Sequence, residues 1–186
     1  KLYYIISGSD DSLADDERVE ICSPTANDSL VLNGTQLQVF DSASGTLGAF
    51  ITKEDGTEHT LSWEASNATI NSITMSNSSD EIDQWSGHLY CSSVTNNGEH
   101  RLYGLGDGCG FSCSGTYTNN GTVIIGEKGT FSCGTLSGSG TISVNSEDAT
   151  LTAETITINS GSTNSGTVNV SSSLSFSGYS TSSAAL

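Results

Sequence analysis

The chain has 186 residues, a length that suits one domain of ordinary size or two small ones. Its formal net charge of −16 repels phosphate groups, which argues against nucleic acid and anionic lipid as partners. No apolar run approaches the roughly 18 residues of a membrane span, so membrane insertion is not expected. The sequence holds 34 Ser, 22 Thr and 21 Gly but one Pro, and it shows no helical periodicity, so we expect an all-β fold.

The first 105 residues are predicted to form an antiparallel, sandwich-like β region. An apolar strand at residues 2–6 has no obvious local partner, and it either covers the edge of the chain's own sheet or adds to a neighbouring copy. Two hairpins are expected next, because Asn33-Gly34 and residues 53–56 are turn-forming segments between apolar strands. The strands of these hairpins are expected at residues 29–32, 36–40, 47–52 and 59–63.

Residues 106–178 repeat with a period of 20 residues and predict a short parallel β-solenoid, in which each repeat forms one rung. The segment Gly110-Phe-Ser-Cys113 recurs as Thr130-Phe-Ser-Cys133, and Thr150-Leu-Thr-Ala153 continues the same phase. Apolar pairs separated by one residue lie between these segments, as in strands with one buried face. The pairs are Val123/Ile125, Ile142/Val144, Ile156/Ile158, Val168/Val170 and Leu174/Phe176. Residues 179–186 are expected to form a Ser/Thr-rich tail.

Five cysteines in such a chain indicate an oxidising compartment. Cys113 and Cys133 are the clearest disulfide candidates, because equivalent residues on adjacent rungs lie about 4.8 Å apart. Cys109 competes for Cys113 or pairs with Cys91 or Cys22, and the odd count leaves one thiol over. The alternative is a metal site made by Cys109, Cys113 and Cys133 with His100 nearby, but this spacing fits no zinc template. We therefore expect neither a metal nor another cofactor.

Six Asn-x-Ser/Thr sequons make the chain a candidate extracellular glycoprotein. The acceptor residues are Asn27, Asn33, Asn67, Asn77, Asn120 and Asn169. The first residue, Lys1, is followed by an apolar segment, which is typical of a mature end left by cleavage of a secretion signal.

No catalytic residue is predicted, because acidic side chains do not recur at the 20-residue phase on which a polysaccharide-cleaving solenoid would depend. Glu127 and Glu147 are the exception, and they are expected to be solvated turn carboxylates rather than a cation site. Four aromatic residues on expected strands, Trp63, Trp85, Tyr90 and Tyr103, are expected to fill the core, and Trp85, which polar residues surround, is the best candidate for a sugar contact. The others considered for this role are Trp63, Tyr90 and Tyr103.

The segment 120–144 resembles the N-terminal β-helical domains of fungal cell-wall proteins of the hyphally regulated adhesin type. It is also similar to bacterial autotransporter passengers and other surface β-helices. The fungal resemblance implies a secreted, wall-linked glycoprotein with a Ser/Thr stalk, a role that residues 180–186 would suit. It carries over no binding residues.

The sequence therefore predicts a non-enzymatic, extracellular structural or adhesive glycoprotein of the cell surface or cell wall, and possible assembly into a surface fibre or coat. Its expected partners are other copies of itself or cell-wall polysaccharide. The alternative is a polysaccharide-active β-helix enzyme or a carbohydrate-binding module.

Overall fold

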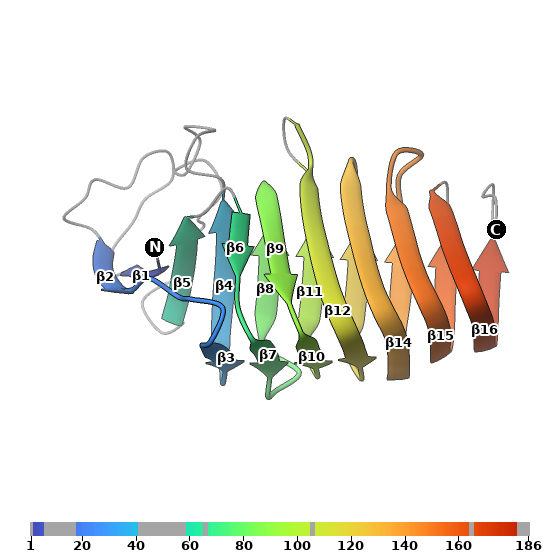
Figure 1. Ribbon diagram of the computed structural model, residues 1–186, viewed down its shortest axis with the longest axis horizontal. Helices are drawn as coiled ribbons and strands as arrows, with labels where there is room; N and C mark the ends of the chain where they lie inside the picture. The colour runs from blue at the N-terminus through green and yellow to red at the C-terminus, as the bar shows by residue number, and fades with distance from the viewer. Residues whose placement is uncertain are drawn as a thin grey trace.

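The computed structural model describes residues 2–5, 18–40, 59–64, 67–104, 107–163 and 166–181. In these residues the protein is built from β-strands, and none of them forms a helix. The described part accordingly contains no helix that is long and apolar enough to cross a bilayer. Figure 1 shows the strands side by side along one long axis, in more than one layer.

The strands in chain order are β1 (Leu2–Ile5), β2 (Arg18–Cys22), β3 (Ser29–Leu32), β4 (Thr35–Phe40), β5 (His59–Glu64), β6 (Asn67–Thr69), β7 (Ser72–Met75), β8 (Glu81–Gln84), β9 (Gly87–Cys91), β10 (Ser93–Asn96), β11 (Glu99–Leu102), β12 (Cys109–Asn119), β13 (Thr122–Ile125), β14 (Gly129–Val144), β15 (Thr150–Thr163) and β16 (Thr167–Thr181).

The ladders arrange these strands into a solenoid with three faces. Face 1 contains β6, β9 and the first segments of β12, β14, β15 and β16. Face 2 contains β3, β7, β10 and the middle segments of those four strands. For face 3 the strands are β4, β8, β11, β13 and the last segments of β14, β15 and β16. All of these ladders are parallel, and residues 67–175 make about five turns with rungs of about 20 residues.

The predicted 20-residue phase is confirmed by the register. Phe111 pairs with Phe131 and Cys113 with Cys133 on face 1, and Phe131 pairs in turn with Leu151. Because successive side chains of a strand point to opposite faces, these apolar positions all point inward and stack on their equivalents in the next rung. The rings of Phe111 and Phe131 stack with centroids 5.2 Å apart.

The corner between faces 2 and 3 is held by a buried asparagine ladder. Asn96 Nδ2 donates to Asn119 Oδ1 over 2.9 Å and to the carbonyl of Thr122 over 3.0 Å. Asn119 Nδ2 donates to the carbonyl of Thr141 over 2.7 Å. These bonds satisfy buried amides and carbonyls where the backbone turns, which a corner inside a closed solenoid requires.

The hairpin predicted at Asn33-Gly34 is wrong, and the antiparallel pairing predicted for the N-terminal region is found only in the described ladders of β1. Strand β3 pairs with β7, whereas β4 pairs with β5 and β8, all in parallel. A two-residue type I′ hairpin needs positive φ at both central residues. Gly34 has a φ of 70°, but among the described residues Lys128 is the one non-glycine residue with positive φ, so Asn33 does not provide the second. The segment is a solenoid corner.

The N-terminal strand pairs within its own chain. Strand β1 pairs antiparallel with both β2 and β5, and β5 pairs parallel with β4. The second predicted hairpin joins residues 47–52 to the segment that forms β5. Its first strand and its turn at 53–56 lie outside the described residues, so this hairpin stays a prediction.

No change of architecture occurs at the expected boundary after residue 105, because the ladders of β9 with β12 and of β11 with β13 cross it. At the C-terminal side, β15 continues to Thr163 and β16 to Thr181. The rest of the expected tail lies outside the described residues.

We expect Asn119→Ala to lower the free energy of unfolding by about 1–3 kcal/mol, because it removes a buried amide that bonds to both neighbouring rungs. The matched control is Asn120→Ala, which changes the adjacent exposed residue and should cost about 0.5 kcal/mol or less. Urea unfolding of the two variants measures the difference. Equal losses would show that the buried ladder does not hold this corner.

Candidate functional site

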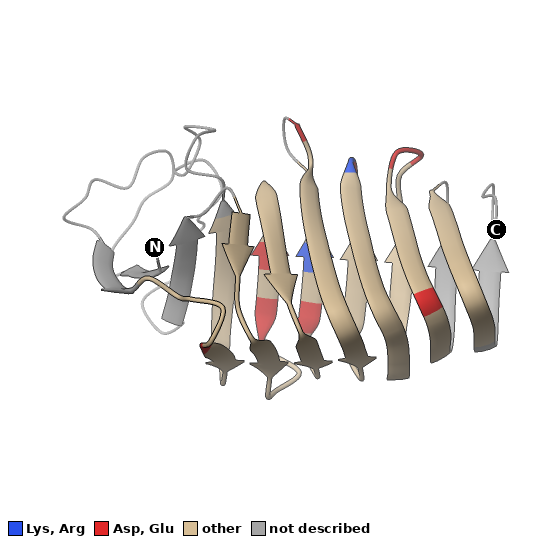
Figure 2. Cartoon of the chain, in the orientation of Figure 1, with Lys and Arg blue, Asp and Glu red and all other residues tan. Residues whose placement is uncertain are grey.

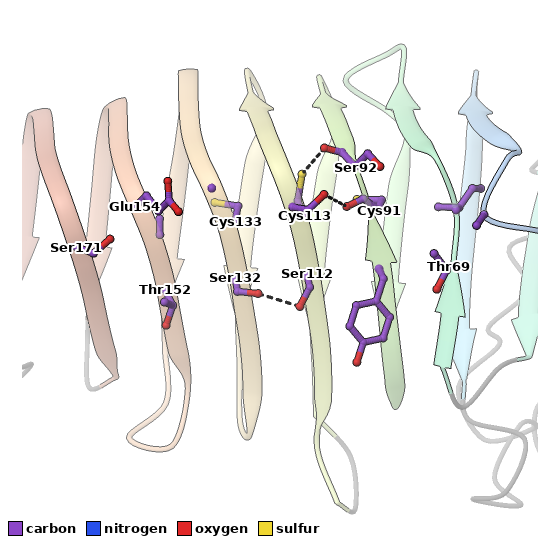
Figure 3. Close-up of a pocket in the computed structure, with 16 residues that line it drawn as sticks. Thr69, Cys91, Ser92, Ser112, Cys113, Ser132, Cys133, Thr152, Glu154 and Ser171 are labelled. Atoms are coloured by element: carbon purple, nitrogen blue, oxygen red, sulfur yellow. Dashed lines mark hydrogen bonds between the residues drawn. The ribbon is translucent and has the colours of Figure 1, made fainter.

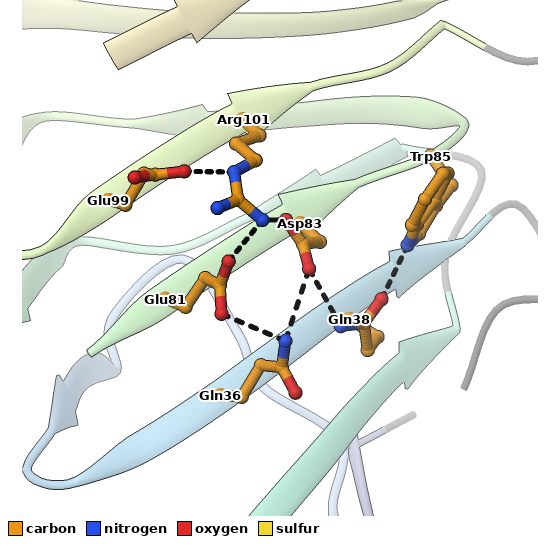
Figure 4. A network of polar contacts seen from close by, with 7 residues as sticks. All are labelled: Gln36, Gln38, Glu81, Asp83, Trp85, Glu99 and Arg101. Atoms are coloured by element: carbon orange, nitrogen blue, oxygen red, sulfur yellow. Dashed lines mark hydrogen bonds and ion pairs between the residues drawn. The ribbon is translucent and has the colours of Figure 1, made fainter. Parts of the chain in front are cut away.

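A polar surface on face 3 is the densest group of charged and hydrogen-bonding side chains on the described solenoid strands. Figure 2 shows negative charge on β8 and both signs of charge on β11, while the strands that follow carry few charges. We call this surface the polar patch. It consists of the seven residues of Figure 4, namely Gln36, Gln38, Glu81, Asp83, Trp85, Glu99 and Arg101, and of Tyr103, whose ring stacks on that of Trp85.

Strand alternation produces the polar patch. Ile82 and Leu102 are inward and fully buried, so the residues on either side of each one point outward. The register then places outward residues of three rungs next to one another. The resulting rows are Gln36, Glu81 and Glu99, and Gln38, Asp83 and Arg101.

Arg101 is the single cation within the patch and lies among three carboxylates. Its guanidinium forms ion pairs with Glu81 and Glu99, and its Nη1 lies 3.6 Å from Asp83 Oδ1. One positive charge against three negative charges leaves the patch anionic when all four groups are charged. An anionic ligand would therefore be repelled.

Two amide side chains connect the carboxylates to the aromatic end of the patch. Gln36 Nε2 donates to Glu81 over 3.0 Å and to Asp83 over 3.2 Å, and Gln38 Nε2 donates to Asp83 over 2.9 Å. Trp85 Nε1 donates to Gln38 Oε1. All three donors are fixed by these contacts, so the patch is preorganised (Figure 4).

Burial shifts the proton affinity of two of the carboxyls. The pKa of Asp83 is raised, mainly by burial, although hydrogen bonds from Gln38 and the charge of Arg101 oppose the shift. The pKa of Glu81 is raised by burial and by the neighbouring charge of Asp83. The side chain of Asp83 is only 5% exposed, and its Oδ1 atom accepts no hydrogen bond from the described residues. Asp83 is thus the most deeply buried carboxyl of the patch.

The aromatic end of the patch is a stacked pair. The rings of Trp85 and Tyr103 lie 4.2 Å apart with an interplanar angle of 12°. The next residue along this row is Gly126, whose backbone N–H bonds to Leu102 as that of Tyr103 bonds to Gln84. Because glycine has no side chain, the column of rings stops at Tyr103.

The expectation of core filling is wrong for Trp85, Tyr90 and Tyr103, whereas Phe111, Tyr117 and Phe131 are buried in the core. Trp85 and Tyr103 are half-buried on the outside of face 3. Tyr90 is 40% exposed on face 1, where it stacks on His88 at 4.2 Å. The inward positions of these rungs are occupied by aliphatic residues such as Leu89 and Leu102, which leaves the alternate positions to the rings. The side chain of Trp63 lies outside the described part.

The structure aligns three of the five cysteines. Cys91, Cys113 and Cys133 are in register on face 1, and we call them the cysteine column. All three are buried free thiols, so the predicted bridge between Cys113 and Cys133 is not formed here. An in-register ladder holds neighbouring Cβ atoms about 4.8 Å apart, whereas a disulfide needs about 3.5–4.5 Å. The side chain of Cys22 lies outside the described residues.

The four residues of the alternative metal site are not brought together as one set, although Cys113 and Cys133 are neighbours. Cys109 is also a free thiol, and its Sγ accepts the N–H of Gly104 over 3.2 Å, at the other end of the face 1 segment from Cys113. His100 is in the interior, where its Nδ1 lies 3.0 Å from the hydroxyl of Tyr117 and burial lowers its pKa to about 3. Within the described ranges, no three His, Cys, Asp or Glu residues are arranged to hold a metal ion.

Two other groups of predicted residues can be placed. Glu127 and Glu147 are exposed at one corner and line a shallow hollow of about 510 Å³ with Asn145, Ser146 and Asp148. All six sequon asparagines are exposed, which leaves them accessible to glycosylation. Glycosylation itself stays a prediction.

Sequence reasoning missed most of the polar patch. The signal was present, because Glu81-Ile-Asp83 and Glu99-His-Arg101 both alternate polar and inward residues. Their spacing is shorter than 20 residues, so a search for acids at the 20-residue phase did not align them.

The raised pKa of Asp83 predicts a pH dependence of stability. The folded state binds this proton more tightly than the unfolded chain, in which the pKa is near 3.8. Stability should therefore fall as the pH rises from about 3.8 through the folded pKa. We expect Asp83→Asn to remove this part of the slope above about pH 3.8, whereas the exposed control Glu154→Gln should not. The free energy of unfolding is measured by urea unfolding at a series of pH values. If it changed with pH equally in Asp83→Asn and in the unmodified protein, the assignment would be contradicted.

Comparison with known proteins adds no family to these observations. No protein-family model matches the chain, and no curated protein or solved structure shows significant similarity to it. The resemblance to fungal cell-wall proteins is supported only at the level of the fold. What the structure shows is a β-solenoid of about five turns.

Proposed function

We propose that the protein is a non-enzymatic, extracellular surface glycoprotein that adheres to neutral polysaccharide through the polar patch. The observation that carries this proposal is the stacked pair Trp85–Tyr103 beside fixed amide, carboxylate and guanidinium groups. Sugars are bound by aromatic rings that contact their apolar C–H faces and by planar polar groups that pair with their hydroxyls. The patch supplies both kinds of group on a rigid sheet.

The charge of the patch supports a neutral ligand. Three carboxylates surround the guanidinium of Arg101, and the whole chain carries a net charge of −16. Acidic polysaccharides would be repelled by both, whereas neutral chains would not. The Gln and Trp donors, by contrast, have partners that a sugar hydroxyl can join or replace.

The structural and extracellular part of the proposal rests on different observations. The parallel ladders give a stiff, elongated body, and the six exposed sequon asparagines are accessible to N-glycosylation. The resemblance of residues 120–144 to fungal wall adhesins favours the same role. Association with other copies, in a fibre or coat, also stays a prediction.

An enzyme acting on polysaccharide is the second candidate, and one observation favours it. Glu81 and Asp83 point outward from the same strand, and both have raised pKa values, as a general acid requires. Against it, Asp83 is almost fully buried and Glu81 is engaged by Arg101 and Gln36. A glycosidase needs one free carboxyl group on each side of the glycosidic bond, and these contacts leave neither Asp83 nor Glu81 free for that role.

Trp85→Ala is expected to weaken binding of neutral polysaccharide about tenfold, which corresponds to ~1.4 kcal/mol, because it removes the larger ring of the stacked pair. Tyr90→Ala, which removes an exposed ring from face 1, serves as the control and should bind normally. Affinity electrophoresis against a panel of neutral and acidic polysaccharides measures the binding affinity of both variants. Equal loss in the two variants, or tighter binding of acidic chains, would contradict the assignment of the patch.

Incubation with the same polysaccharides is expected to release no new reducing or unsaturated ends. The reason is that the two carboxyls with raised pKa are held by their own neighbours. If such ends were released in a saturable manner, and if Glu81→Gln abolished their release, the adhesive proposal would be wrong and the enzymatic one would be supported.

A further inference from the structure

The cysteine column lies along a groove on the outside of the solenoid. The groove has a volume of about 480 Å³ and crosses several rungs. Figure 3 shows Cys91, Cys113 and Cys133 on successive strands along it, with Ser112 and Ser132 on the same strands. The three thiols are 5%, 2% and 7% exposed, respectively, so they lie beneath the floor of the groove.

Cys113 occupies the middle of the column and has a possible disulfide partner on each side. Cys91 is its in-register neighbour on β9, and Cys133 is its neighbour on β14. The two outer cysteines are two rungs apart, about 9.6 Å from the strand spacing, which no disulfide can span. The column can therefore hold one bridge at a time, and that bridge must include Cys113.

The corner beside Cys113 is the part of this face where the ladder is irregular. The register between β12 and β14 shifts between Cys113 and Thr116. Small residues follow both thiols at this corner, namely Ser114 with Gly115 after Cys113, and Gly134 after Cys133. The irregular ladder makes this corner the place where the in-register spacing of the two thiols can change, although Gly115 and Gly134 themselves pack closely against the backbone of the neighbouring rung.

We propose that the cysteine column is a thiol–disulfide exchange site that reacts with low-molecular-weight disulfides of the glutathione class. It holds one intramolecular bridge, formed by Cys113 with either Cys91 or Cys133, and leaves the third thiol reduced.

The reaction proceeds in two exchange steps. The thiolate of Cys113 attacks one sulfur of the small disulfide RSSR, which forms a mixed disulfide and releases RS⁻. The thiolate of a neighbouring cysteine then attacks Cys113 Sγ, which forms the protein bridge and releases a second RS⁻. Each RS⁻ takes up one of the two protons lost by the protein thiols. Two electrons pass from the protein to the small disulfide, so two protein thiols and RSSR yield one bridge and two RSH.

Electrostatics favours Cys113 as the first nucleophile. A hydrogen bond from Cys91 lowers the pKa of Cys113, and the same contact raises the pKa of Cys91. Burial raises the pKa of Cys133 to about 12. Among the three, Cys113 therefore carries the largest thiolate fraction near neutral pH.

The geometry also makes the bridge reversible. Closing it requires the two Cβ atoms to approach by about 0.3–1.3 Å, from the ladder spacing of about 4.8 Å to the roughly 3.5–4.5 Å of a disulfide. A strained disulfide has a higher reduction potential and exchanges more readily than a relaxed one. The third thiol, next to the bridge, can attack Cys113 Sγ and move the bridge by one rung.

The test equilibrates the folded protein in oxidised glutathione, quenches the reaction with acid, counts the remaining thiols after denaturation and measures the protein mass. The mass separates a bridge, which loses two hydrogens, from mixed disulfides, which each add one glutathione. Cys22 is replaced by Ser in every variant, because its side chain lies outside the described part. We expect the parent, Cys91→Ser, Cys133→Ser and the matched control Cys109→Ser each to lose two thiols to one bridge. Cys113→Ser should form no bridge. An intramolecular bridge in Cys113→Ser, or none in the parent, would overturn the proposal.

A peptide map of the Cys109→Ser protein does not depend on whether Cys113→Ser folds. Trypsin cuts after Arg101 and Lys128, which separates the three cysteines of the column into three peptides. Under oxidising conditions, the peptide of Cys113 should be found joined to that of Cys91 in some molecules and to that of Cys133 in others. A bridge between the peptides of Cys91 and Cys133 would contradict the proposal.

Discussion

In-register parallel stacking is the constraint on which the rest of this structure depends. Each residue has its equivalent in the next rung as its closest non-bonded neighbour, about 4.8 Å away. A side chain must therefore be compatible with its equivalents above and below it. Phe111 on Phe131 satisfies this by aromatic stacking, and Asn96 on Asn119 does so by an amide hydrogen bond.

The same constraint shapes the two surfaces that carry function in our account. Stacking identical carboxylates would be repulsive, and Glu81 does lie beside Glu99. The guanidinium of Arg101 contacts both and offsets this repulsion. On face 1, stacking aligns three thiols instead, so that the central one has two equivalent neighbours. One geometry thus produces a polar patch on one side and a cysteine column on another.

The sequence was sufficient for the solenoid only where its period is regular. The Phe-Ser-Cys segments at 111–113 and 131–133 repeat without insertion, and their predicted register is confirmed. The earlier rungs have unequal lengths, which hides their phase. Asn33-Gly34 was misread, because a hairpin and a solenoid corner both use a glycine with positive φ, and only the partners of the flanking strands distinguish them. The polar patch was missed because the unequal lengths of these rungs hide the alignment of its residues. Trp85 is the one member of the patch that was chosen from the sequence as the best sugar contact.

Solution NMR tests the central claim, the in-register parallel ladder, most directly. The account predicts backbone cross-strand nuclear Overhauser effects between residues one rung apart, such as Val123 with Ile142 and Phe131 with Leu151. It also predicts contacts of Leu30 with Ile73 and of Leu37 with Ile82 in the N-terminal rungs. Contacts between residues 29–32 and 35–40 in an antiparallel pattern would restore the hairpin and contradict the solenoid in this region.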